Sequence, residues 1–299
     1  GFSRDNPGTR IRFSITPQGL KTMSTYPDKP TLFTVPLNKG NVSQYITYDR
    51  NVRIDSKKDF ECLTENEYEP IKEITSFNRD ANDQILRTLR IAISTTGEYT
   101  NFWDDGDNTN GDAQEDALAA VVSTLNRINE VFEVDMAVTF QLVSGIEIIY
   151  PTASTDPYSS NLNNQLQSTL TSEVGESNYD IGHLFNYDGN NGNAGCIGCV
   201  CVDGQKGSGF SSHQFTDNDG GPYMDDFFDI DYVPHEIGHQ MGGNHTFSQS
   251  NEGTGVNYEP GSGTTIMGYA GITGANDVQD HSDPYFHYGT INQVLNNLD

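Results

Sequence analysis

The sequence predicts an α/β (α+β) fold with a mixed sheet, preceded by a small β-rich segment. Two observations indicate this class. Before residue 81, short runs rich in β-branched and aromatic residues are separated by Pro, Gly and Asn. After residue 81, strand-like runs alternate with runs whose apolar residues recur at helical spacing. We therefore expect a β-rich segment and linker over residues 1–80 and a larger domain over residues 81–299.

The expected elements of the first segment are short strands. They lie at Arg12–Ile15, Thr31–Val35 and Gln44–Tyr48, and residues typical of turns separate them. An acidic stretch, Glu65–Glu73, follows these strands and indicates a linker.

The larger domain is expected to begin with a strand and to continue with helices that carry clear start signals. Asp112, with Glu115 three residues later, forms a capping-box signature before apolar residues at helical spacing. Leucines four residues apart, from Leu162 to Leu170, indicate a second helix. The expected strands are Leu89–Thr95, Val138–Val143, Ile146–Tyr150 and Tyr179–Phe185.

Residues 235–245, with the sequence HEIGHQMGGNH, carry the strongest functional signal. His235 and His239 are four residues apart, so on a helix they share one face and can bind one Zn²⁺. Gly242 allows the positive φ that ends the helix, and the turn returns His245 as a third nitrogen ligand. Three protein ligands leave a fourth position for water, which indicates a catalytic rather than a structural zinc site.

This pattern resembles the extended zinc motif of the metzincin metallopeptidases, which is followed by a methionine turn. Met267 lies 22 residues after His245 in a stretch flanked by glycine, and it matches that turn. The resemblance implies that Met267 packs beneath the three histidines without binding the metal. It also implies a twisted mixed sheet within an upper subdomain, residues 81–243, and a lower subdomain, residues 244–299.

Within this clan the chain looks most like the secreted bacterial reprolysin (adamalysin-like) proteases. The resemblance rests on residues 95–100 (TTGEYT), 229–232 (DIDY) and 258–263 (YEPGSG), and it covers roughly residues 85–299. It implies a secreted, extracellular zinc endopeptidase that acts on protein or peptide substrates.

The zinc motif and the resemblance together predict peptide hydrolysis through a metal-activated water. Glu236 is the expected general base, which takes a proton from the water and passes it to the leaving amine. Two roles stay open for Tyr269: an electrophilic helper, by resemblance to astacins and serralysins, or a packing residue of the turn. The alternative function is a non-catalytic binding protein that zinc stabilises, although such a protein needs no base at position 236.

Cys62 precedes the larger domain and has two open interpretations. The resemblance implies that residues 1–80 are a pro-segment that inhibits its own enzyme, with the Cys62 thiolate at the open zinc position. Otherwise Cys62 forms a disulfide with one of the three cysteines in Gly195–Val202. That stretch is either an edge strand that pairs with an extended substrate or an irregular loop tied by a disulfide.

The net charge of −26, from 42 acidic and 16 basic residues, argues against nucleic acid and anionic lipid as partners. No run approaches the roughly 20 apolar residues of a membrane span, and we expect a monomer. Two acidic stretches offer oxygen ligands for Ca²⁺, and the other interpretation is a solvated surface. They are residues 104–107 (DDGD), and Asp217 and Asp219 followed by Asp225 and Asp226.

Overall fold

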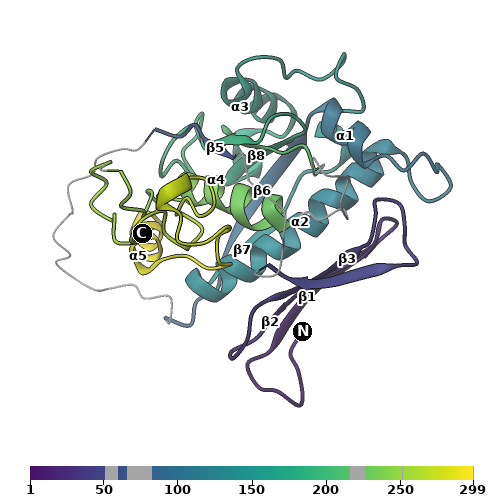
Figure 1. Cartoon of the computed structure of the whole chain (residues 1–299). Helices are drawn as coiled ribbons and strands as arrows, with labels where there is room; N and C mark the ends of the chain where they lie inside the picture. Colours follow the sequence, from purple (N-terminus) through teal and green to yellow (C-terminus); the bar gives the residue numbers. More distant parts are fainter. Residues whose placement is uncertain (51–59, 66–82, 216–225, 251, 299) are drawn as a thin grey trace.

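The computed structural model describes residues 1–50, 60–65, 83–215, 226–250 and 252–298, and it has the predicted mixed α/β fold (Figure 1). The described strands form a four-stranded sheet, in the order β1-β2-β3-β4, and a six-stranded sheet, in the order β5-β9-β10-β8-β6-β7. Apart from Glu65, the expected linker Glu65–Glu73 lies outside the described residues, and the domain division stays a prediction.

The N-terminal sheet is an antiparallel meander whose neighbouring strands are consecutive in the chain. Three of its strands confirm the sequence prediction to within two residues at each end. The strand β2 was not predicted, because its sequence GLKTMST has only two large apolar residues. The four strands are β1 (Arg10–Thr16), β2 (Gly19–Thr25), β3 (Leu32–Pro36) and β4 (Tyr45–Asp49).

The larger sheet is mixed, because β9 and β10 are antiparallel while the other paired strands are parallel. Three predicted strands are confirmed as β6 (Arg87–Thr95), β7 (Val138–Leu142) and β8 (Ile181–Asn186). The strands that were not predicted are β5 (Glu61–Cys62), β9 (Asn191–Asn193) and β10 (Gly209–Ser212).

The predicted strand Ile146–Tyr150 is wrong. Residues Ile146–Ile148 form the 3₁₀ turn η2, and Ile149 makes an isolated parallel bridge to Thr95. Both Ile148 and Ile149 are buried. A short apolar run indicates burial, but it does not distinguish a strand from another buried segment.

The described α-helices are α1 (Gly97–Trp103), α2 (Ala113–Met136), α3 (Leu162–Glu173), α4 (Val233–Gln240) and α5 (Tyr288–Asn297). The predicted capping box is present at the start of α2: Asp112 accepts from the backbone of Glu115, and Glu115 accepts from the backbone of Asp112. The predicted second helix is α3.

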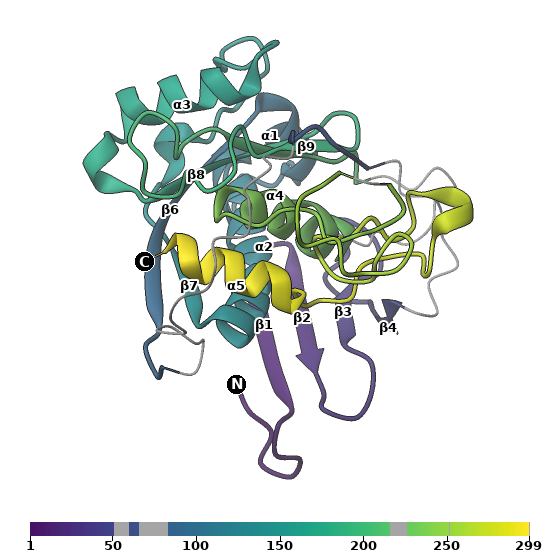
Figure 2. The same cartoon turned by 90° about the vertical axis from the view of Figure 1, so that its left-hand side faces the viewer.

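The six-stranded sheet is covered on both faces (Figure 2). On one face, α3 packs its leucines against Ala92 and Leu184 of the sheet. On the other face, α2 and α4 pack with Ile91 and Ile93 in the larger apolar core. Because successive residues of a strand point to opposite faces, β6 contributes side chains to the apolar cores on both faces of the sheet. No helix of the described residues has the length and apolar content needed to cross a bilayer.

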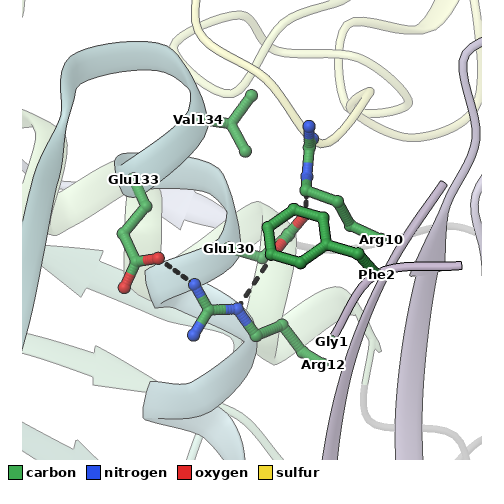
Figure 3. Close-up of a pocket in the computed structure, with 7 residues that line it drawn as sticks. All are labelled: Gly1, Phe2, Arg10, Arg12, Glu130, Glu133 and Val134. Atoms are coloured by element: carbon green, nitrogen blue, oxygen red, sulfur yellow. Dashed lines mark hydrogen bonds and ion pairs between the residues drawn. The ribbon is translucent and has the colours of Figure 1, made fainter. Parts of the chain in front are cut away.

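The N-terminal sheet is attached to α2 by ion pairs (Figure 3). Arg10 Nε lies 2.7 Å from one Glu130 oxygen, and Arg12 Nε lies 3.0 Å from the other. Arg12 also pairs with Glu133, one turn along the helix.

A second attachment lies just after β4, at Arg50. Its side chain is 4% exposed and pairs with Asp226 at 2.8 Å and also with Asp231. It also donates to the backbone oxygen of Ser282, at 2.5 Å. Tyr48 Oη donates to the other oxygen of Asp226, at 2.6 Å. The first segment is therefore held next to the residues that lead into α4.

Candidate metal centre

Three imidazoles from α4 and the turn after it converge on one point. His245 Nε2 lies 3.2 Å from His235 Nε2 and 3.1 Å from His239 Nε2. Cys62 Sγ lies 3.6 Å from His239 Nε2, and ligand atoms of all four residues lie within 4.8 Å of one another. Zn–N distances of ~2.1 Å and Zn–S distances of ~2.3 Å place tetrahedral ligand atoms roughly 3.3–3.6 Å apart. The donor set therefore fits Zn²⁺.

Hydrogen bonds on the far side of each ring direct the metal-binding nitrogens inward. His235 Nδ1 and His239 Nδ1 each donate to a backbone oxygen at 2.7 Å, and His245 Nδ1 lies 3.0 Å from a Glu252 oxygen. Burial, followed by the neighbouring imidazoles, lowers the pKa of His239 and His245 well below the usual range. The rings of His239 and His245 are thus neutral, and the Nε2 of each offers a lone pair to the shared centre.

Two glycines allow the local backbone path that the sequence predicted. Gly242 has a φ of +112°, and it carries the chain out of α4 toward His245. Gly238 allows the close approach of Met267, because a Cβ at position 238 would lie 2.6 Å from Met267 Sδ. Met267 is fully buried against α4, and its role as the methionine turn stays a prediction.

Three buried hydrogen bonds position α4 and the residues before it between the sheet and α2. His183 of β8 donates from Nδ1 to Gln240 Oε1 at 2.8 Å, and Gln240 donates to the Gly182 backbone at 3.0 Å. On the other side, Asp229 accepts from Arg127 of α2 at 2.7 Å. These contacts set the position of the residues on either side of the first two histidines.

Glu236 is fully buried beside the three histidines. Its Oε2 accepts from Thr64 Oγ1 at 2.9 Å, and Oε1 has no hydrogen-bond partner among the described residues. Burial raises the pKa of this carboxyl to about 8. Gly192 of β9 makes room for it, since a Cβ there would lie 2.6 Å from Glu236 Oε1.

Cys62 reaches the histidines from β5, which pairs in parallel with β9. Its thiol is free, so the interpretation that Cys62 forms a disulfide is wrong for this structure. The disulfide joins Cys196 and Cys199, and Cys201 is free and exposed. Because Cys196 pairs with Cys199, Cys62 stays available to the metal centre.

The strand next to Glu236 is β9, which lies between β10 and the edge strand β5. Of the two alternatives for Gly195–Val202, the structure has the disulfide-tied loop. Glu61 and Leu63 donate their backbone N–H groups to Asn190 and Gly192, at 2.9 and 2.8 Å. The first segment therefore adds a strand beside β9, whereas the sequence predicted an extended substrate along Gly195–Val202, which is a loop.

Tyr269 lies against the ring of His245, with centroids 4.6 Å apart, and against Phe247 at 4.3 Å. These contacts agree with the packing role. Burial raises the pKa of the phenol, and the neighbouring Cys62, Glu252 and Glu236 add to this effect. The role of electrophilic helper stays a prediction.

Three residues of the centre were missed by sequence reasoning. Thr64 binds Glu236, and Glu252 binds the third histidine. Glu259 accepts from the backbone of Thr264 and Thr265 and so shapes the turn before Met267. The only sequence signal was for Glu259, which lies within the family-like stretch 258–263.

The two acidic stretches proposed for calcium have different outcomes. Asp104 and Asp105 lie close to Asp116, whereas the Asp107 carboxylate accepts from Thr109 in its own turn. In the second stretch, Asp217, Asp219 and Asp225 lie outside the described residues, and Asp226 pairs with Arg50.

Comparisons with known proteins give a family and similar solved structures. The sequence profile of the family described as "Metallo-peptidase family M12B Reprolysin-like" matches residues 85–298. No curated protein sequence matches the chain. The crystal structure of metalloproteinase-II from Bacteroides fragilis is 12% identical, with a TM-score of 0.47. The alignment covers 99% of this chain and 80% of that chain.

Proposed function

This chain belongs to the M12B family of reprolysin-like metallopeptidases, and from this premise we propose that it is a zinc-dependent endopeptidase made as a latent precursor. The observation that carries the proposal is the convergence of three Nε2 atoms beside a buried carboxylate. The non-catalytic alternative gives no reason to bury Glu236 next to a metal site, because an unpaired buried carboxylate is costly.

The residues of the centre have different proposed roles in peptide hydrolysis. His235, His239 and His245 would hold Zn²⁺, which when bound lowers the pKa of a water and polarises a carbonyl. Glu236 accepts the proton from the attacking water and later donates it to the leaving amine. Tyr269 is proposed to assist the developing oxyanion from the same side.

Latency is proposed to come from residues Phe60–Thr64. Cys62 Sγ would be the fourth ligand of a bound zinc ion, and the Thr64 hydroxyl donates to the Glu236 carboxylate that a water would need. Phe60 is buried and stacks on Tyr232 with ring centroids 4.2 Å apart, which anchors the strand next to His235. This segment therefore competes with both the water and the substrate backbone.

Secretion is part of the proposal, and the disulfide between Cys196 and Cys199 supports it. Disulfides persist in oxidising surroundings and are rare in reducing cytosol. The proposed partners are a protein or peptide substrate and the chain's own first segment as inhibitor, with the protein itself as a monomer.

The deciding experiment compares Glu236→Gln with wild type after limited proteolysis in the residues that follow Glu65. Wild type should cleave casein, and Glu236→Gln should lose about 10²–10⁴-fold in rate while keeping one zinc per chain by metal analysis. Glu98→Gln, an exposed glutamate on α1, is the matched control and should leave the rate unchanged.

Two results would contradict the proposal. Processed wild type that holds zinc but hydrolyses no polypeptide would favour the binding-protein alternative. A Glu236→Gln enzyme as fast as wild type would remove the proposed general base.

A further inference from the structure

The loop between α1 and α2 brings three carboxylates together, far from the histidines in sequence. Asp104 and Asp105 follow α1, and Asp116 lies in the first turns of α2. One oxygen of each lies within 4.8 Å of the others. Asp104 and Asp105 are exposed, whereas Asp116 is only 1% exposed.

The buried carboxylate of Asp116 is only partly satisfied by hydrogen bonds. Its Oδ2 accepts from the Asp105 backbone at 3.0 Å, but its Oδ1 has no hydrogen-bond partner among the described residues. Burial raises the pKa of Asp116, and repulsion from Asp105 and Asp104 adds to that effect. A buried carboxylate oxygen without a partner is costly, and a bound cation would satisfy it.

A cation close to the cluster is Lys39, which comes from the first segment between β3 and β4. Its Nζ donates to the backbone oxygen of Asp104 at 3.2 Å and lies 4.7 Å from the centre of the Phe102 ring. The three carboxylates attract this ammonium, but it donates to none of them. Lys39 therefore offsets part of the negative charge of the cluster without a direct hydrogen bond to its carboxylates.

We infer that Asp104, Asp105 and Asp116 bind a calcium ion that ties α1 to the start of α2. Three carboxylates on a turn suit Ca²⁺, which takes six to eight oxygen ligands in flexible geometry and completes its shell with water. Mg²⁺ demands a stricter octahedron, and Zn²⁺ prefers nitrogen and sulfur ligands. Lys39 competes with the ion as long as the first segment is attached.

The position of the single tryptophan gives a direct test. Trp103 is the only tryptophan in the chain, and it immediately precedes Asp104. Tb³⁺ substitutes for Ca²⁺ at oxygen sites, so excitation of Trp103 in the full-length chain should produce sensitised terbium emission. This emission should saturate with added Tb³⁺ and should disappear when Ca²⁺ is added in excess.

Variants assign the emission to the three carboxylates. Asp116→Asn and Asp105→Asn should each weaken Tb³⁺ binding tenfold or more, whereas Lys39→Ala should strengthen it several-fold. Asp107→Asn is the matched control, because that carboxylate caps its own turn outside the cluster, and it should bind like wild type. The emission requires no peptidase activity, so its outcome is independent of the proposed function.

Folding is checked by circular dichroism and by the intrinsic fluorescence of Trp103. Asp105 is exposed, so Asp105→Asn keeps the test decisive even if Asp116→Asn fails to fold. The inference is overturned if wild type gives no sensitised emission. It is equally overturned if the emission of Asp105→Asn matches that of wild type.

Discussion

At the scale of single residues, the same degree of burial has opposite consequences for different carboxyl groups. Glu130 is buried, and hydrogen bonds from Arg10 and Arg12 outweigh burial and lower its pKa. Glu236 is also buried but faces the neutral hydroxyl of Thr64, and burial raises its pKa to about 8. The partner therefore decides whether the pKa of a buried acid in this protein falls or rises.

Asp135, near the end of α2, offers a test of this reasoning away from the metal centre. Burial raises its pKa to about 6, although it accepts from the Phe286 backbone at 2.6 Å. Between about pH 4 and 6 the folded state holds a proton that the unfolded state has released, so stability falls as pH rises. Above about pH 6 the buried carboxylate is ionised, and it lowers the free energy of unfolding by its full amount.

We expect Asp135→Asn to raise the free energy of unfolding at pH 7 by about 1–3 kcal/mol, since the amide keeps an acceptor oxygen without the charge. The gain should vanish below about pH 4, where both forms are neutral. Urea denaturation at several pH values measures this. Asp28→Asn, at an exposed turn position, should show no such gain; an equal effect in both variants would rule out the assigned cause.

At the scale of elements, local patterns predicted those parts of the molecule that carry their own signal. Helix α2 was predictable because Asp112 and Glu115 form a capping box, and α4 because its histidines repeat at helical spacing. By contrast, β9 has the sequence Asn-Gly-Asn, which lacks any strand preference. It is a strand because its neighbour β10 supplies the pairing.

The residues of the metal centre also differ in whether the sequence alone could predict them. The three histidines lie within eleven residues, so their spacing alone predicts that they share one metal ion. Thr64 is 172 residues from Glu236, and no local pattern connects the two. The choice between a disulfide and a metal ligand for Cys62 also required the fold, because it depends on which residues face β5.

The short strand β5 leads to a prediction about latency in the full-length chain. Cys62→Ser should raise basal casein cleavage by about tenfold or more, because a hydroxyl is a far weaker zinc ligand than a thiolate. Thr64→Val should add a smaller increase by releasing Glu236, and the double variant should exceed either single variant. Cys201→Ser, at an exposed free cysteine, is the control.

Full-length Cys62→Ser that stays as inactive as wild type, yet becomes active after proteolysis, would show that the thiol is not the inhibitory group. Equal activation by Cys201→Ser would point to a general loss of structure instead.

At the scale of the whole molecule, charge is divided unequally between the first segment and the rest. Residues 1–80 hold 12 of the 16 basic residues, whereas residues 81–299 hold 31 of the 42 acidic ones. The described ion pairs follow this division, because Arg10, Arg12 and Arg50 all bind acids of the larger part. Electrostatic attraction therefore contributes to attaching the first segment before any strand pairing is considered.

The two attachments should respond differently to salt. Arg10 and Arg12 are 29% and 26% exposed, so ions screen them, whereas Arg50 is 4% exposed and is largely protected. The screening length falls from about 10 Å at 0.1 M salt to about 3 Å at 1 M. After cleavage in the residues that follow Glu65, the first segment should stay bound at low salt and leave increasingly as salt is raised.

Gel filtration and casein cleavage of the cleaved complex over a salt series measure this release. Arg12→Gln should leave a smaller dependence on salt, since its screened pairs with Glu130 and Glu133 are gone, while the exposed Arg4→Gln should behave like wild type. Arg50→Gln should weaken binding at every salt concentration, because it removes a guanidinium from two buried carboxylates. Release that does not vary with salt would mean that apolar packing, including Phe60 on Tyr232, holds the segment without help from the arginines.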